Sequence, residues 1–198
     1  FFTTLLLFTF SISGFSQRIP HTEKYVAPWA CDLLIVGGTV VTMDGGRRVI
    51  ENGAVAIKDG KVAMVGPRAV VTKNLRAKQT INANGKAVIP GLINTHTHAA
   101  MSLFRGISDD LDLNDWLTKF IFPAEAKNVN EQFVRAGTRL GIAEMIKGGT
   151  TTYCDMYYFE DAVADETKKA GMRGVLGETI IKFPVSDNKT PEAALAYT

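Results

Sequence analysis

The sequence predicts an α/β fold in which a small β domain comes before a parallel sheet. Between residues 31 and 88, short apolar runs are separated by glycine-containing turns, and from residue 87 onward strand-like and helix-like segments alternate. Such alternation is typical of a parallel sheet with right-handed crossovers. A doubly wound sheet and a (β/α)8 barrel both fit this order. Since a barrel takes about 250 residues, residues 89–198 would hold about three of its eight strands.

The composition is that of a globular protein with a balanced charge. Of the 198 residues 46% are hydrophobic and 21% are charged, with 22 Lys and Arg against 20 Asp and Glu. These fractions exclude a disordered, collagen-like or coiled-coil chain. The basic residues are scattered, so we expect no nucleic-acid partner. Cys31 and Cys154 indicate neither a disulfide framework nor a Cys-x-x-Cys metal site, and we interpret them as unpaired small hydrophobes.

Residues 1–17 are predicted to be a signal peptide. Residues 1–10 are apolar apart from three threonines, and residues 11–17 are mostly small and polar. The apolar run is shorter than the roughly 20 residues of a membrane-spanning helix, so we expect no stable membrane span. Residues 18–30 would be a tail before the fold. On this interpretation the protein is periplasmic or secreted. If the segment is instead an apolar strand or a translation artefact, we expect a cytoplasmic protein.

Residues 31–88 are predicted to form a small, incomplete β-sandwich domain that supports the rest of the fold. Short apolar runs at the spacing of strands indicate such a domain. Asp59-Gly60 lies between two of these runs and predicts a two-residue hairpin, because a type I′ turn needs a positive φ at both central positions. Asn84-Gly85 predicts a second turn of this kind.

Residues 89–198 are predicted to form the alternating part of the fold. A helix is expected near residues 113–120. A longer helix begins at a cap formed by Asn128 or Asn130 and ends at Gly148-Gly149, with apolar side chains at helical spacing between them. The later predicted elements are a strand over 150–156, a helix over 160–170 and a strand over 174–181.

His96 and His98 follow an apolar segment, residues 87–95, that we interpret as a strand. Side chains two positions apart on a strand point to the same side, so both imidazoles can give a nitrogen to one metal ion. The pair falls at the carboxyl end of the strand, where active sites of parallel α/β folds lie. A catalytic zinc usually has at least three protein ligands. Asp155, at the end of the next strand, is one candidate for a further ligand, and residues beyond Thr198 are another.

The segment Pro-Gly-Leu-Ile-Asn-Thr-His-Thr-His at residues 90–98 resembles the first barrel strand of the amidohydrolase superfamily. Further likeness comes from residues 101–106, 109–111, 116–117, 123–127 and 148–152. Together these segments resemble the branch that holds the 5-methylthioadenosine/S-adenosylhomocysteine deaminases and the triazine chlorohydrolases. The likeness covers the chain from about Asp32 to Ile181.

This resemblance implies the N-terminal part of a (β/α)8 barrel, with the small β domain completed by the C-terminus. It implies that His96 and His98 bind one Zn²⁺ or another divalent metal. Glu125 matches the residue that binds the ribose hydroxyls in the nucleoside deaminases, and Trp116 would line the same pocket. The remaining metal ligands and the catalytic acid–base residues would lie beyond Thr198, so no catalytic residue is assigned within this chain.

The reaction that the resemblance implies is hydrolysis of a non-peptide C–N bond. A metal-bound hydroxide would deaminate a purine nucleoside-like or other cyclic small molecule. Residues 175–179 depart from the deaminases of this branch, so a cyclic amide or a halogenated ring is an alternative substrate. A catalytically dead barrel that serves as a binding scaffold is an alternative from another class. A homo-oligomer is compatible with the sequence, which does not fix the oligomeric state.

Each candidate residue also has a purely structural interpretation. Glu125 could be a solvated surface carboxylate, as most glutamates are. Trp116 could pack in the core or a lid, and Asp155 could cap a turn. The aromatic residues between 153 and 159 are interpreted as packing rather than as a platform on which a base stacks.

Overall fold

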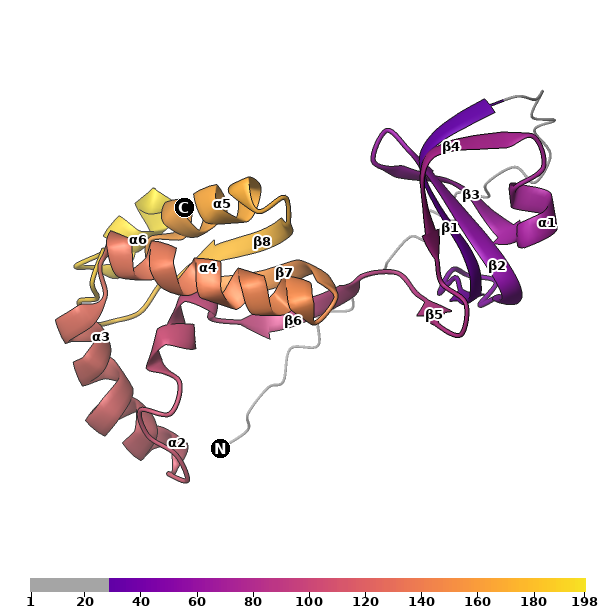
Figure 1. The fold of residues 1–198 in the computed structure, drawn as a ribbon. Helices are drawn as coiled ribbons and strands as arrows, with labels where there is room; N and C mark the ends of the chain where they lie inside the picture. Colours follow the sequence, from indigo (N-terminus) through magenta and orange to yellow (C-terminus); the bar gives the residue numbers. More distant parts are fainter. Residues whose placement is uncertain (1–28) are drawn as a thin grey trace, which may run out of the picture. The chain divides into compact units, whose positions relative to one another are not determined.

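The computed structural model describes residues 29–198 (Figure 1). The predicted signal peptide at residues 1–17 and the predicted tail as far as residue 28 lie outside the described residues. The chain divides into two compact units, one that ends at Ile89 and one that runs from Pro90 to Thr198. Within the described part, no helix combines the length and the apolar character needed to cross a membrane.

The first unit is a mixed β-sheet with one short helix. Its elements are β1 (Trp29–Val41), β2 (Val49–Lys58), β3 (Lys61–Pro67), α1 (Arg68–Val71), β4 (Leu75–Asn82) and β5 (Ala87–Val88). The strand order is β3-β2-β1-β4, and β5 pairs with β1 as well. Cys31 on β1, Ala54 on β2 and Val71 on α1 are buried in the core of this unit. Because the described strands join one sheet, the predicted sandwich of two sheets is not confirmed.

The hairpin predicted at Asp59-Gly60 is confirmed. Asp59 has a φ of 51° and Gly60 a φ of 72°, and Lys58 pairs with Lys61 across the turn. Both central residues therefore have the positive φ that a type I′ turn requires. This turn joins β2 to β3 in antiparallel order.

The second predicted hairpin turn, at Asn84-Gly85, is wrong. A turn is present, in which the Lys86 N–H donates to the Ala83 carbonyl at 2.9 Å. However, the flanking strands β4 and β5 both run parallel to β1, which has 13 residues and so is long enough to pair with each in turn. The turn packs against Gly37, where an added Cβ would lie 1.9 Å from Asn84 Oδ1. A local turn signal cannot show which strand its flanks will join.

The second unit is a parallel sheet of three strands covered by helices (Figure 1). The strands, in the order β6-β7-β8, are β6 (Leu92–Thr97), β7 (Thr150–Tyr157) and β8 (Arg173–Glu178). The helical segments are η1 (Ala99–Phe104), α2 (Leu113–Asp115), η2 (Trp116–Ile121), α3 (Phe122–Asn128), α4 (Glu131–Lys147), α5 (Glu160–Lys169) and α6 (Pro191–Tyr197). Both strand pairs are parallel, so the predicted α/β alternation is confirmed from β6 to β8.

A side-chain cap sets the start of the long helix α4. Asn130 Oδ1 accepts a hydrogen bond from the Phe133 N–H at 2.9 Å. Of the two asparagines predicted as alternative N-terminal caps, Asn130 is therefore the one that caps the helix. The Asn128 side chain instead donates to the Ala124 carbonyl at 2.8 Å. The helix predicted near residues 113–120 lies within a helical run from α2 through the π-helix η2 to α3.

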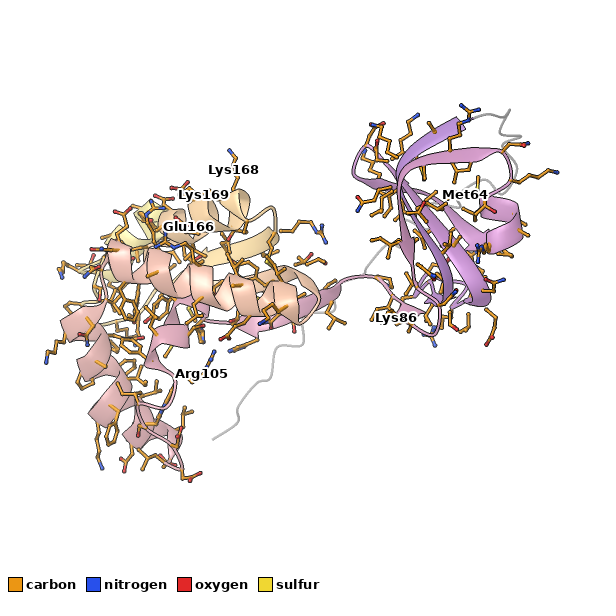
Figure 2. The ribbon with its side chains drawn as sticks, viewed as in Figure 1. Met64, Lys86, Arg105, Glu166, Lys168 and Lys169 are labelled. Carbon is orange, nitrogen blue, oxygen red and sulfur yellow. The ribbon has the colours of Figure 1, made fainter. Side chains whose placement is uncertain are left out.

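Helix α4 connects η1 to α5 through two kinds of contact. Gly137 lies against the backbone of η1, where an added Cβ would be 2.2 Å from the Ala100 carbonyl oxygen. Arg135 forms an ion pair with Glu166 of α5 at 3.1 Å. Lys169 pairs with the same carboxylate at 2.9 Å, and Glu166 and Lys169 both lie on α5 (Figure 2). The segment that follows the histidine pair is therefore held against the helical layer.

Candidate functional site

The two predicted metal ligands lie together at the carboxyl end of β6. His96 is the penultimate residue of β6, and His98 follows its last residue. Their ring centroids are 5.2 Å apart, with 77° between the ring planes. His96 is exposed and His98 is half-buried. This separation is compatible with two nitrogen donors for one ion, because each zinc–nitrogen bond is about 2.1 Å long.

A backbone carbonyl of β7 fixes the tautomer of His98. His98 Nδ1 lies 2.5 Å from the Met156 carbonyl oxygen. A carbonyl only accepts hydrogen bonds, so Nδ1 carries the proton and Nε2 keeps its lone pair. Metal-bound histidines characteristically donate their second ring N–H in this way. The donor chemistry of His98 therefore fits a divalent metal.

Asp155 holds the backbone directly after His98. Its side chain is 2% exposed, and Oδ1 accepts a hydrogen bond from the Ala99 N–H at 2.9 Å. Oδ2 is buried and has no hydrogen-bond partner among the described residues. Burial raises the pKa of Asp155 to about 6. Asp155 thus holds the chain segment directly after His98, and the described contact does not cap the loop that follows its own strand.

The described residues do not by themselves complete a metal centre. Among them, no three His, Cys, Asp or Glu side chains are close enough together to hold an ion. Asp155 therefore does not form a three-ligand site with His96 and His98 in this arrangement. The two imidazoles fit as a partial ligand set that needs further donors.

Glu125 is buried and hydrogen-bonded, which excludes its interpretation as a solvated surface residue. It lies on α3 and is 6% exposed. Its Oε1 accepts from the Tyr157 hydroxyl at 2.9 Å, and its Oε2 accepts from the Tyr158 hydroxyl at 3.2 Å. Burial raises the pKa of Glu125, and the two tyrosine hydrogen bonds oppose that rise. A buried carboxylate supported in this way can serve as an acceptor for a ligand.

One cavity brings three of the four predicted site residues together. It has a volume of about 170 Å³, and His98, Trp116 and Glu125 all line it. His96 is not among its lining residues. The rest of the lining is largely apolar: Met101, Leu117, Ile121, Phe122, Met156, Tyr157, Tyr158, Thr179 and Ile181. An apolar cavity with a few polar groups is the usual form of a small-molecule site. A larger cavity of about 370 Å³ shares Glu125 but has no histidine in its lining.

The sequence analysis did not predict the contacts between Glu125 and the two tyrosines. Tyr157 and Tyr158 were expected to be packing residues, and they are buried, at 3% and 5% exposed. Their hydroxyls nevertheless reach a carboxylate 32 and 33 residues away along the chain. Only the pairing of β7 with β6 and the position of α3 bring these groups together. The Tyr-Tyr pair directly after a strand-end Asp-Met is the one feature that could have drawn attention to them.

A second group of buried carboxylates lies beside the start of α5. Glu160 is 7% exposed and Glu178 is 9% exposed, and neither Glu160 oxygen has a hydrogen-bond partner among the described residues. Burial, together with the charges of Asp155 and Glu178, raises the pKa of Glu160 to about 8. Burial and the neighbouring Asp187 raise the pKa of Glu178 to about 7. Glu160 is therefore expected to be largely protonated at neutral pH.

Replacing Glu160 by glutamine is expected to stabilise the protein at pH 8 but not at pH 4. In the unfolded chain Glu160 ionises above its ordinary pKa of 4.5, whereas in the folded chain it ionises only near pH 8. The free energy of unfolding therefore falls as pH rises from 4.5 to 8. The two pKa values lie about 3.5 apart, each pKa unit corresponds to ~1.4 kcal/mol, and the folded group is half ionised at pH 8, so we expect a gain of about 4 kcal/mol at that pH. Urea unfolding of the full-length protein and of the Glu160→Gln variant at pH 4 and pH 8 measures this change in the free energy of unfolding.

Glu192→Gln provides the control for that measurement. Glu192 lies exposed on α6, so the same change of chemistry there removes no buried carboxyl group. It is expected to alter the free energy of unfolding by about 0.5 kcal/mol or less. A gain for Glu160→Gln that is equal at pH 4 and pH 8 would contradict the raised pKa.

Comparison with known proteins identifies the family of the chain. The model of the Amidohydrolase family matches residues 87–197, which is more than half of the 198 residues. The chain therefore belongs to the amidohydrolase family. The matched region contains His96, His98, Trp116 and Glu125, and it includes the whole parallel sheet.

Relatives and solved structures give a finer comparison. Over 167 residues the chain is 48% identical to a 5-methylthioadenosine/S-adenosylhomocysteine deaminase 1 of Syntrophus aciditrophicus (strain SB), covering 84% of the chain and 38% of that relative. A crystal structure of an adenosine deaminase from Xanthomonas campestris with bound zinc has a TM-score of 0.82 at 39% identity, covering 86% and 39% of the two chains. A triazine hydrolase from Arthrobacter aurescens has a TM-score of 0.67 at 25% identity, covering 74% and 35%. The chain thus spans less than half the length of these proteins.

Proposed function

We propose that this chain forms part of a metal-dependent amidohydrolase that deaminates a purine nucleoside or a similar cyclic small molecule. The observation that carries the proposal is the cavity in which His98, Trp116 and Glu125 meet. The likeness to a 5-methylthioadenosine/S-adenosylhomocysteine deaminase and to a zinc-containing adenosine deaminase supports the choice of substrate class. On this proposal β6, β7 and β8 are the first three strands of a (β/α)8 barrel, and further chain completes the small β domain as a sandwich.

His96 and His98 would hold a divalent metal, with zinc as the first candidate. His98 offers Nε2 because its Nδ1 proton is donated to the Met156 carbonyl. A bound divalent metal would supply a water molecule whose pKa is lowered toward 7. Further ligands and the acid–base residue would come from outside the described residues. The Met156 carbonyl keeps the His98 ring in one orientation and one tautomer.

Glu125 and Trp116 would bind and orient the substrate. Glu125 would accept hydrogen bonds from two neighbouring hydroxyls of a ribose, since a carboxylate has more acceptor positions than its two tyrosine donors use. Trp116 would pack against a flat ring, because an indole presents a large apolar face. The apolar lining of the cavity would exclude bulk water from the reacting carbon. Export of the protein and a homo-oligomeric state stay predictions.

Release of ammonia by the full-length protein tests the proposed function. The zinc-loaded protein is incubated with adenosine, 5-methylthioadenosine, S-adenosylhomocysteine, a cyclic amide and a chlorotriazine, and ammonia and chloride are measured. We expect ammonia from at least one adenosine derivative. Glu125→Gln is expected to raise KM for that substrate about tenfold, because a neutral amide is a weaker acceptor than a carboxylate. Release from the amide or chlorotriazine alone would assign the alternative substrate class, and no release at all would favour a binding scaffold.

A further inference from the structure

We propose that Tyr157 and Tyr158 are positioning residues that hold the Glu125 carboxylate in the orientation needed to bind substrate hydroxyls. This inference rests on the proposed function and goes beyond it, because it assigns a role to two residues that the sequence indicates only as packing. The two hydroxyls use separate oxygens of Glu125, at 2.9 Å for Tyr157 and 3.2 Å for Tyr158. Together they fix the plane of the carboxylate.

The shape of the chain at the end of β7 makes this double contact possible. Successive side chains on a strand point to opposite faces, so two neighbouring tyrosines would normally diverge. Tyr157 is the last residue of β7, and Phe159 has a left-handed φ of 54°. The Phe159 N–H is held by Asp187 at 2.6 Å. The chain therefore leaves the strand at Tyr158, and the two rings lie with centroids 4.7 Å apart.

The hydrogen-bonding capacity of Glu125 matches a role in binding a diol. Each carboxylate oxygen can accept two hydrogen bonds, and each accepts one from a tyrosine. One further acceptor position is left on each oxygen, and Glu125 lines the same cavity as His98 and Trp116. Without the tyrosines a carboxylate that is 6% exposed would lose both partners, and its orientation would no longer be fixed.

The same strand end also contacts the predicted metal ligand. Asp155 accepts from the Ala99 N–H, the Met156 carbonyl accepts from His98 Nδ1, and the next two residues bind Glu125. Residues 155–158 therefore contact both the segment of the predicted metal ligand His98 and the predicted substrate-binding residue Glu125. A change in the tyrosine hydroxyls is expected to act on Glu125 and to leave the contacts of His98 in place.

Phenylalanine variants test the role of the hydroxyls in the full-length, metal-loaded protein. Tyr157→Phe and Tyr158→Phe each remove one hydrogen bond and keep the ring. Kinetics and calorimetric binding are compared for adenosine and 2′,3′-dideoxyadenosine, which lacks the two hydroxyls. We expect each variant to raise KM and Kd for adenosine about tenfold and to change those for the dideoxy compound less than twofold, with kcat nearly unchanged. Tyr153→Phe is the matched control, because Tyr153 is fully buried on the same strand and its hydroxyl bonds to Thr167, away from the cavity.

The outcomes separate a positioning role from simple packing. Equal losses for both nucleosides, or no loss for either, would overturn the positioning role, as would a Tyr153→Phe variant with the same selective loss. If the wild-type protein binds adenosine but releases no ammonia, the proposed reaction fails, and the Kd comparison still decides the role of the tyrosines. The positioning role would also be overturned if the wild-type protein bound adenosine and its dideoxy analogue equally well. Thermal unfolding of each variant confirms that it is folded before the comparison.

Discussion

Replacing His96 or His98 by alanine is expected to remove the bound divalent metal and to lower kcat/KM about a thousandfold or more. Each variant deletes one of the two imidazoles whose ring centroids lie 5.2 Å apart at the end of β6. A metal at this position would contribute several kcal/mol to stabilising charge in the transition state, and about 4 kcal/mol corresponds to a thousandfold. Metal content by elemental analysis and ammonia release by the full-length protein measure the two effects.

His21→Ala is the control for both measurements. The sequence has three histidines, and His21 is the one outside the pair, within the predicted tail at residues 18–30. The variant therefore removes an imidazole and leaves both candidate ligands in the sequence. We expect its metal content and kcat/KM to equal those of the wild-type protein. Metal content that stays unchanged in both His96→Ala and His98→Ala would refute the assignment of this pair as ligands.

A separate variant distinguishes metal binding by His98 from the support that Asp155 gives to the backbone. Asp155→Asn keeps the size of the side chain and an oxygen that can accept from the Ala99 N–H. It is therefore expected to keep the bound metal if Asp155 only holds the chain. Loss of metal in this variant would instead indicate that the carboxylate takes part in ligation.

The sequence predicted those parts of the fold that depend on residues close together in the chain. The hairpin at Asp59-Gly60 follows from the φ preferences of two residues. The start of α4 was expected at Asn128 or Asn130, and the structure shows that Asn130 is the cap. The turn at Asn84-Gly85 failed as a hairpin because its flanks pair with β1, more than 40 residues upstream. The sandwich prediction has the same weakness, since strand spacing does not reveal which strands share a sheet.

The candidate site divides in the same way between local and distant contacts. The proximity of His96 and His98 follows from a two-residue spacing on one strand. The burial of Glu125 and its hydrogen bonds to Tyr157 and Tyr158 do not follow from any local spacing, because these hydrogen bonds join α3 to the end of β7. A glutamate at the start of a helix looks the same in sequence whether it faces solvent or a cavity.

Gly137→Ala is expected to destabilise the protein by about 3 kcal/mol and to weaken metal binding. An added Cβ would lie 2.2 Å from the Ala100 carbonyl oxygen, and the contact is with backbone, which cannot rotate away. Ala99 and Ala100 are buried, at 2% and 0% exposed, so η1 has no free space into which to move. Overpacking of this kind costs about 1–3 kcal/mol, and displacing the chain beside His98 is expected to lower metal affinity about tenfold or more.

The sign of the change in the free energy of unfolding of Gly137→Ala distinguishes tertiary packing from helix propensity. In an exposed helix, alanine is more favourable than glycine by about 1 kcal/mol, so propensity alone predicts that Gly137→Ala stabilises α4. Gly148→Ala is the control, because an added Cβ there would lie 3.4 Å from the nearest atom and the backbone φ is −81°. We expect Gly148→Ala to change the free energy of unfolding by less than about 0.5 kcal/mol. Urea unfolding and zinc titration of both variants decide the matter: a Gly137→Ala protein that is as stable as the wild type would show that α4 does not pack directly on the backbone beside His98.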